Sequence, residues 1–209
     1  SSRPRVKGEF VIAMGLVESK NIEQLRSWMS IPQMLFAGMK NDRFPKPLAK
    51  LAADLRERLD SNASSEFIRE LMAACQIEFE SLLSSLEVDD LDVPQAMASQ
   101  RRLVNLMAFI GHLFRLRAVR GNSIIHCLLN ALLGWDQERS RWQGQPQEFE
   151  VNCACALLSA VGSAYACNTR GSRVYLARLK SIKTARSWSE ATQQEIDALI
   201  HTWAQEWTP

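Results

Sequence analysis

Five cysteines and three histidines are the residues of this chain with the chemistry for nucleophilic catalysis or metal binding. Cys127 and Cys167 are the candidates for a thiol that a histidine would activate, as in a Cys-His hydrolase. His126 stands beside Cys127, and Cys153 and Cys155 follow, but the paired spacing of a tetrahedral metal site on helices is missing. We therefore expect no metal ion to bind here.

Catalytic motifs of other kinds are not found in the sequence. It has no Gly-rich phosphate loop, no G-x-S-x-G elbow and no carboxylate pair distinct from ordinary surface acids. Cys75, Cys127 and Cys155 fall on apolar helix faces, where free cysteine usually acts as a small buried hydrophobe. An odd cysteine count without framework spacing favours a reducing compartment. We expect a cytoplasmic protein that is not an enzyme, has no catalytic residue and takes no cofactor.

Positive charge gathers between Glu150 and Glu190, where no acidic residue occurs. Such a segment could attract RNA phosphates, or an acidic protein surface, with a strength that falls as salt is added. A solvated basic surface without a ligand is the other interpretation. Exposed aromatic residues do not alternate with the cations, so we expect no sequence-specific reading of bases. The candidate phosphate-binding residues are Arg170, Arg173, Arg178, Lys180, Lys183 and Arg186.

Apolar residues recur every three or four positions along most of the chain, which is the period of helices. With 46% hydrophobic residues and a net charge of +2, the 209 residues can bury one core. Strands are not expected. The apolar run Val151–Cys167 is too short and too interrupted by polar residues to cross a bilayer, so no membrane contact is expected. The sequence predicts a single all-α domain over residues 1–209.

Prolines and polar clusters mark the helix boundaries in the first half of the chain. An apolar stripe after Pro32 stops at residues 41–47, and a second stripe over 48–59 returns along it. This pattern predicts an antiparallel helical hairpin, closed by loop-forming residues at 61–65. Residues 87–100 contain acidic residues and a proline and are predicted to form an inter-helix loop.

The second half of the chain has one long break and one well-marked final helix. Residues 134–148 predict a surface loop that holds Trp135 and Trp142, whose role the pattern does not explain. Ser187 has capping-box spacing to Glu190 at the start of the last helix. Residues 1–8 are expected to be a flexible end. Because the chain begins without Met or a leader segment, we expect it to be an excerpt of a longer protein.

Three segments in the same order resemble one known family. Arg101–Leu116 reads RRLVNLMAFIGHLFRL, Phe67–Glu80 reads FIRELMAACQIEFE, and Cys155–Gly162 reads CALLSAVG. Together with Ile124–Leu133 they resemble the middle domain of eukaryotic translation initiation factor four-G. The resemblance implies an all-α, right-handed solenoid of about five antiparallel helix pairs of the HEAT type.

The resemblance also implies a function. Family members are scaffolds that bind and stimulate a DEAD-box RNA helicase, initiation factor four-A, by contacting both of its lobes. Asp42, Arg43 and Phe44 occupy the place where the family has E-P-x-F, which implies contact with the carboxy-terminal lobe. Trp207 aligns with the family tryptophan that touches the amino-terminal lobe. For Phe44 and Trp207, packing into the core is the other interpretation, because aromatic residues at such positions usually point inward.

Further partners follow from the same resemblance. RNA is a candidate for non-specific binding, and a cap-binding protein would be recruited through regions outside this chain. The domain itself is expected to be monomeric. Two other readings stay open: a related middle-domain scaffold of messenger RNA decay or nuclear RNA processing that binds another DEAD-box helicase, and a helical platform that binds RNA.

Overall fold

The computed structural model describes residues 36, 42–86, 92–136, 138–166 and 169–206, without the side chains of 166–172 and 206. Most of these residues are helical, which confirms the predicted all-α fold class. The contacts divide the chain into two compact units, Ser1–Val119 and Arg120–Pro209, which we describe one at a time. No helix in the described part of the chain is long and apolar enough to cross a membrane.

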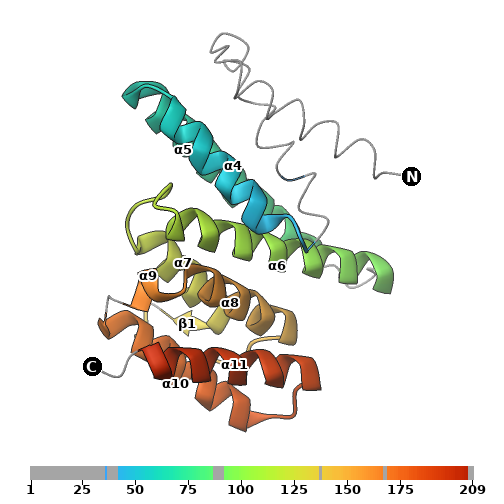
Figure 1. The fold of residues 1–209 in the computed structure, drawn as a ribbon. Helices are drawn as coiled ribbons and strands as arrows, with labels where there is room; N and C mark the ends of the chain where they lie inside the picture. The colour runs from blue at the N-terminus through green and yellow to red at the C-terminus, as the bar shows by residue number, and fades with distance from the viewer. Residues whose placement is uncertain (1–35, 37–41, 87–91, 137, 167–168, 207–209) are drawn as a thin grey trace. The chain divides into compact units, whose positions relative to one another are not determined.

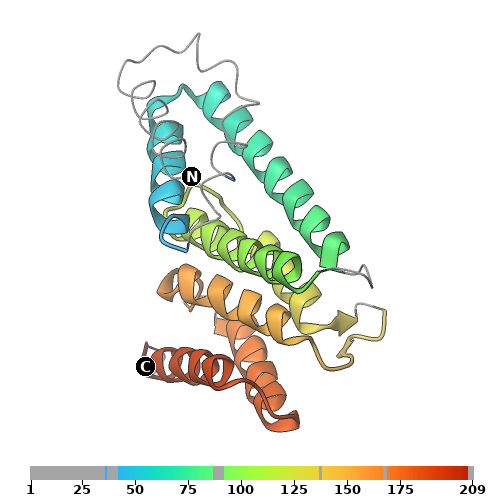
Figure 2. The ribbon, with the colours of Figure 1, turned by 90° about the vertical axis from the view of Figure 1, so that its right-hand side faces the viewer.

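The first unit is built on α4 (Pro45–Arg58), α5 (Ser61–Leu86) and α6 (Val93–Arg115). Helices α4 and α5 diverge from their connecting turn, and α6 packs against both (Figures 1 and 2). One face of α6 supplies the centre of the core. Its apolar side chains recur at helical spacing and are covered by α4 and α5, so this face buries a large apolar area. The fully buried members of that face are Leu103, Leu106, Met107, Phe109 and Leu113.

Two boundaries in this unit differ from the sequence-based prediction. Residues 61–65 are the first turn of α5 and not a loop, because the Asp60 carboxylate caps the helix: Oδ1 accepts from the backbone N–H of Asn62 at 3.0 Å and of Ala63 at 2.9 Å. The predicted loop at 87–100 is also too long, since α6 begins at Val93 with Pro94 in its first turn. Both segments therefore belong to helices.

The second unit contains α7 (Ser123–Leu133), α8 (Glu148–Val161), α9 (Ser163–Ala166), α10 (Thr169–Ala185) and α11 (Glu190–Glu206). Helix α8 packs between α7 and α11, and α10 packs against α11. Val151 and Leu158 are buried on one side of α8 and Cys153 and Leu157 on the other, which shows that it is the central helix of the unit. This explains why the sequence there reads as one nearly continuous apolar run.

The predicted loop 134–148 contains a small hairpin that the sequence did not predict. Strands β1 (Trp135–Asp136) and β2 (Arg141–Trp142) pair antiparallel, with Trp135 opposite Trp142. The two indole rings meet edge to face with their centroids 4.9 Å apart. Their role is therefore structural: they pack on each other and close the hairpin against the helical unit.

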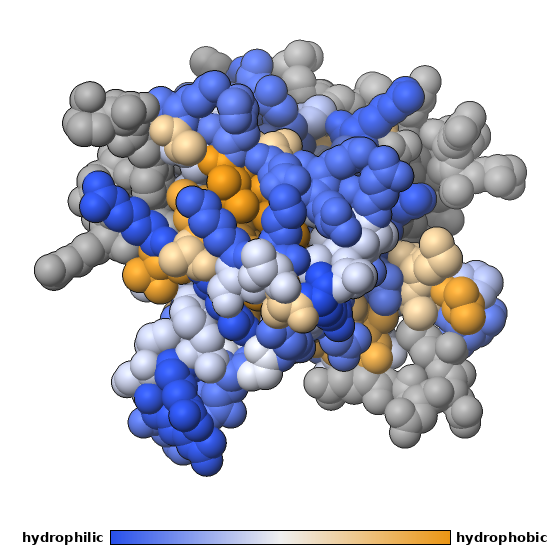
Figure 3. Space-filling view, turned by 90° about the horizontal axis from the view of Figure 1, so that it is seen from below, coloured by the Kyte–Doolittle hydropathy of each residue, from blue (hydrophilic) through white to orange (hydrophobic). Residues whose placement is uncertain are grey.

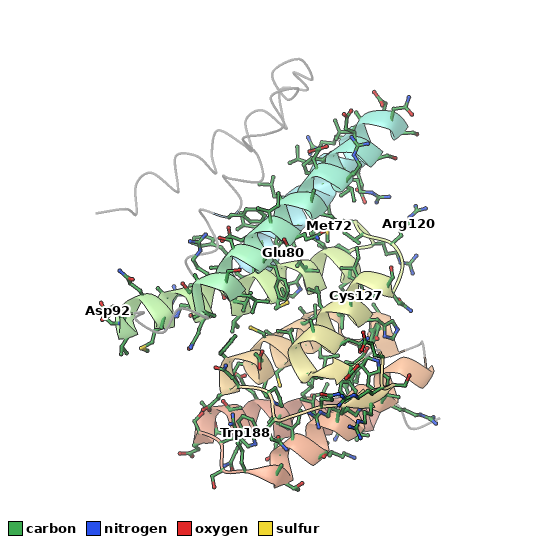
Figure 4. The ribbon with its side chains drawn as sticks, turned by 180° about the vertical axis from the view of Figure 1, so that it is seen from behind. Met72, Glu80, Asp92, Arg120, Cys127 and Trp188 are labelled. Carbon is green, nitrogen blue, oxygen red and sulfur yellow. The ribbon has the colours of Figure 1, made fainter. Side chains whose placement is uncertain are left out.

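The start of α11 is capped two residues later than the sequence pattern indicated. Ser189 is the cap, because its Oγ accepts from the backbone N–H of Thr192 at 3.3 Å, and Thr192 in turn is buried. Trp188 lies at the turn between α10 and α11 (Figure 4) and donates its indole N–H to the carbonyl oxygen of Ile182 at 3.0 Å. These bonds fix the α10–α11 turn.

Candidate functional site

The candidate contact segment Asp42–Phe44 lies just before α4 and is tied to α6. Asn105 Nδ2 donates to Asp42 Oδ1 at 3.1 Å, and Arg101 Nε lies 3.7 Å from the same oxygen. Asn105 is only 4% exposed, so its amide is a fixed anchor. From the sequence, Asp42 was predicted to contact a partner helicase. Its internal hydrogen bond to Asn105 on α6 was not predicted. The carboxylate of Asp42 therefore positions the segment.

The three residues of this segment differ in exposure. Asp42 and Arg43 are exposed, Phe44 is half-buried, and the following Pro45 is buried. The backbone carbonyl of Phe44 accepts from the N–H of Leu48 at 2.9 Å, which makes Phe44 the residue that precedes the first turn of α4. The exposure of Phe44 therefore lies between the two interpretations that the sequence left open, an exposed anchor and a core residue.

Arg178 does not belong to the candidate phosphate-binding surface. It is 8% exposed, its Nε donates to the carbonyl oxygen of Leu133 at 3.2 Å, and its Nη2 donates to that of Gly144 at 2.8 Å. The guanidinium also lies 5.3 Å from the ring centroid of Trp142. Burial lowers its pKa below the ordinary value. Arg178 is therefore a structural residue that holds the hairpin to α7 and α10.

The other cations of the basic segment fall into two groups. Lys183 lies opposite Asp197 on α11, with Nζ 2.6 Å from Oδ2, so part of its charge is compensated. Arg173, Lys180 and Arg186 are exposed, and the Arg186 guanidinium stacks 3.8 Å from the ring centroid of Trp188. The side chain of Arg170 lies outside the described residues. In the view of Figure 3, hydrophilic side chains cover much of the surface, with apolar patches between them.

A polar cluster surrounds His126 inside the second unit. Its Nδ1 lies 3.0 Å from the hydroxyl of Tyr175 and 3.1 Å from that of Tyr165, and Tyr175 donates to Asn130 Oδ1 at 2.8 Å. Burial lowers the pKa of His126 and raises that of Tyr175 to about 12. The hydroxyl contacts of the imidazole connect α7 with α9 and α10. Among the described residues, no cysteine thiol is hydrogen-bonded to His126.

The cysteines give little support to a hydrolase. Cys75 and Cys155 are buried, as expected, and Cys153 is buried as well. Burial raises the pKa of Cys155 to about 12. Cys127 is exposed on α7 (Figure 4), which corrects the expectation that it is a core residue. Cys167 lies outside the described residues. Within the described ranges no group of three or more metal-ligating side chains lies together.

The second candidate contact, Trp207, also lies outside the described residues, one position after α11 ends at Glu206. Trp203, one helical turn earlier, is 1% exposed, with its ring centroid 6.3 Å from that of Tyr165. The apolar face of α11 is therefore anchored in the core at Trp203.

A family model described as the MIF4G domain matches residues 35–201, which include every described helix from α4 to α10 and most of α11. The chain belongs to the MIF4G family. The all-α fold is thus the helical solenoid fold of MIF4G domains, and the recognition made from the three sequence segments is confirmed.

One curated relative of this MIF4G domain is the eukaryotic translation initiation factor 4 gamma of Dictyostelium discoideum. It is 26% identical over an alignment of 164 residues, and the match covers 72% of this chain and 11% of that protein. The chain therefore spans about a tenth of the length of the relative it matches, and represents a divergent MIF4G domain.

Proposed function

We propose that this MIF4G domain is a non-enzymatic scaffold module of translation initiation that binds a DEAD-box RNA helicase of the four-A type in the cytoplasm. The observation that carries the proposal is the match to the MIF4G domain over residues 35–201, together with the similarity to a translation initiation factor 4 gamma.

Two separate parts of the chain would contact the helicase. Arg43 and Phe44, held by the bond from Asn105 to Asp42, would meet the carboxy-terminal lobe. Trp207, after the end of α11, would meet the amino-terminal lobe. A half-buried phenylalanine beside an exposed arginine suits a protein interface, because aromatic residues and arginine are enriched there relative to the rest of the surface.

The scaffold would act by shifting a population. A helicase that opens and closes between its two lobes is biased by any partner that binds one arrangement more tightly than the other. Two weak lobe contacts on one chain reinforce each other through effective concentration. The domain would thereby stimulate the ATPase of the helicase without itself taking part in the chemistry.

Isothermal titration with a four-A-type helicase tests the proposal. We expect a dissociation constant in the micromolar range or below, and no measurable heat at about 50 μM of each partner would overturn it. Parallel titrations with helicases of messenger RNA decay and nuclear processing distinguish the related scaffolds: tighter binding to one of these would reassign the domain.

Non-specific RNA binding is a second candidate, supported by the exposed cations of α10. Arg173 and Lys180 are two helical turns apart and share one face, and Arg186 follows at the end of the helix. Replacing all three by Ala should weaken single-stranded RNA binding and reduce its salt dependence by about 0.7 log units per lost phosphate contact. Unchanged RNA affinity would exclude this surface.

A further inference from the structure

A groove of about 450 Å³ lies in the first unit between the first turns of α4 and the end of α6. Lys46 and Lys50 line it from α4, and His112, Arg115 and Leu116 from α6 and the residue after it; Pro47 completes the lining. Sequence patterns did not predict this groove, because its lining residues lie in two segments about 65 positions apart that only the fold brings together.

All titratable groups in the lining are basic. Within the described residues none of Lys46, Lys50 or Arg115 lies within salt-bridge distance of a carboxylate. Asp54, four residues after Lys50 on α4, is not part of the lining. The pKa of His112 is lowered first by burial and then by the charges of Lys46 and Arg115, which is the expected response to uncompensated positive charge.

The groove also has an apolar component. Leu116, just after α6, is 42% exposed, and Pro47 on α4 is exposed as well. The aliphatic stems of Lys46, Lys50 and Arg115 add further apolar surface, since long basic side chains keep only their tips in water. A groove lined by both apolar surface and cations is complementary to an apolar side chain with negative charges beside it.

We propose that this groove binds an acidic peptide segment of a partner protein, in which an aliphatic or aromatic anchor residue is flanked by Asp or Glu. The anchor would pack on Pro47 and Leu116, and the flanking carboxylates would pair with Lys46, Lys50 and Arg115. RNA is the less suitable occupant, because no Phe, Tyr or Trp side chain lines the groove for a base to stack on. The proposal does not depend on the helicase, and none of Asp42, Arg43 and Phe44 lines the groove.

Selection from a random dodecapeptide library displayed on phage, with the complete 209-residue chain as bait, tests the proposal. We expect enrichment of peptides with Asp or Glu on both sides of a Leu, Ile or Phe. Fluorescence anisotropy of the best peptide should then show about tenfold weaker binding to Lys46→Glu. Glu at this position in the first turn suits the helix dipole, so a loss of binding cannot be attributed to a weakened helix.

Two further variants separate charge from apolar contact. Leu116→Ser should weaken binding about fivefold to tenfold, since a leucine-sized contact is lost. Arg56→Glu, the same charge reversal further along α4 and outside the groove, should change binding by less than about twofold. Thermal melts of each variant confirm that the fold is kept.

Three outcomes would overturn the proposal. The first is a set of selected peptides without an excess of acidic residues. The second is equal binding of the selected peptide to the parent and to Lys46→Glu. The third is a selection that yields no acidic peptide while an oligouridylate binds to the parent and not to Lys46→Glu. That result would assign the groove to RNA phosphates.

Discussion

Arg178 shows how a single residue can be misjudged from charge alone. In the sequence it is one of six cations in a segment without acids, but Tyr175, Leu179 and Ile182 on the same helix face are buried beside it. That apolar spacing was the available signal that Arg178 points inward. A buried arginine needs acceptors, and the two carbonyl oxygens of Leu133 and Gly144 supply them. The basic segment is therefore less cationic at its surface than its sequence indicates.

Replacing Arg178 by Met should destabilise the protein. The variant keeps an apolar stem but leaves the carbonyl oxygens of Leu133 and Gly144 without their donors, and we expect a loss of about 2 to 3 kcal/mol in the free energy of unfolding. Arg173→Met, an exposed position on the same helix, should change it by less than about 0.5 kcal/mol. Urea unfolding followed by circular dichroism measures both. Equal effects would show that Arg178 has no structural role.

His126 should make stability depend on pH. Its pKa is lowered in the folded protein, so below its ordinary value of 6.5 the unfolded chain binds the proton more readily. Above pH 6.5 the neutral imidazole contributes its full share to the free energy of unfolding. That share is lost as the pH falls from 6.5 toward the lower pKa of the folded protein. The melting temperature should therefore drop between about pH 7 and pH 5.

Two variants isolate the contribution of His126 from those of other titrating groups. His126→Gln keeps a donor and an acceptor near Tyr165 and Tyr175, and its melting temperature should fall less steeply with acid than that of the parent. His201→Gln changes an exposed histidine on α11 and should keep the slope of the parent. An unchanged slope in His126→Gln would mean that other groups cause the pH dependence.

At the scale of elements, helix periodicity was reliable and helix ends were not. The apolar stripe of α6 lies in the core as predicted, because a 3.6-residue pattern specifies which side is buried. The starts of α5 and α6 were placed too late, although Asp60 and Pro94 are ordinary start signals, because serines and acidic residues near them were read as loop. The β1–β2 hairpin could not be predicted, since two-residue strands carry no periodicity.

Gly134 should be indispensable for the junction between α7 and β1. Its φ is +74°, and a Cβ atom there would lie 2.6 Å from the backbone carbonyl oxygen of Gln143. Gly134→Ala therefore combines left-handed strain with a backbone clash, and we expect a loss of at least about 2 kcal/mol. Gly144→Ala, with a φ of +63° and open space around its Cβ, should lose only about 1 kcal/mol. Chemical denaturation of the two variants would contradict this account if their losses were equal.

At the scale of the whole molecule, three recognised segments sufficed to identify the family, because in a helical-repeat protein each helix pair leaves its own local pattern. The division into the units Ser1–Val119 and Arg120–Pro209 was not predictable, since it depends on which helices contact one another. The expectation of a single domain over residues 1–209 stays a prediction. The candidate helicase contacts Asp42–Phe44 and Trp207 fall in different units, and this separation provides a test of the two-lobe hypothesis.

If each unit contacts one lobe of the helicase, isolated lobes should respond to different variants. Phe44→Ala should weaken binding of the carboxy-terminal lobe by about 1 to 3 kcal/mol and leave the amino-terminal lobe unaffected. Trp207→Ala should do the reverse at an unchanged melting temperature. Trp203→Ala is the matched control on α11: since this ring is 1% exposed, its loss should cost roughly 3 to 5 kcal/mol of folding stability. With the intact helicase both single variants should lose affinity, because each removes one of two linked contacts. If neither Phe44→Ala nor Trp207→Ala changes the binding of either lobe, these two residues are not the contact sites, even if the domain binds the helicase.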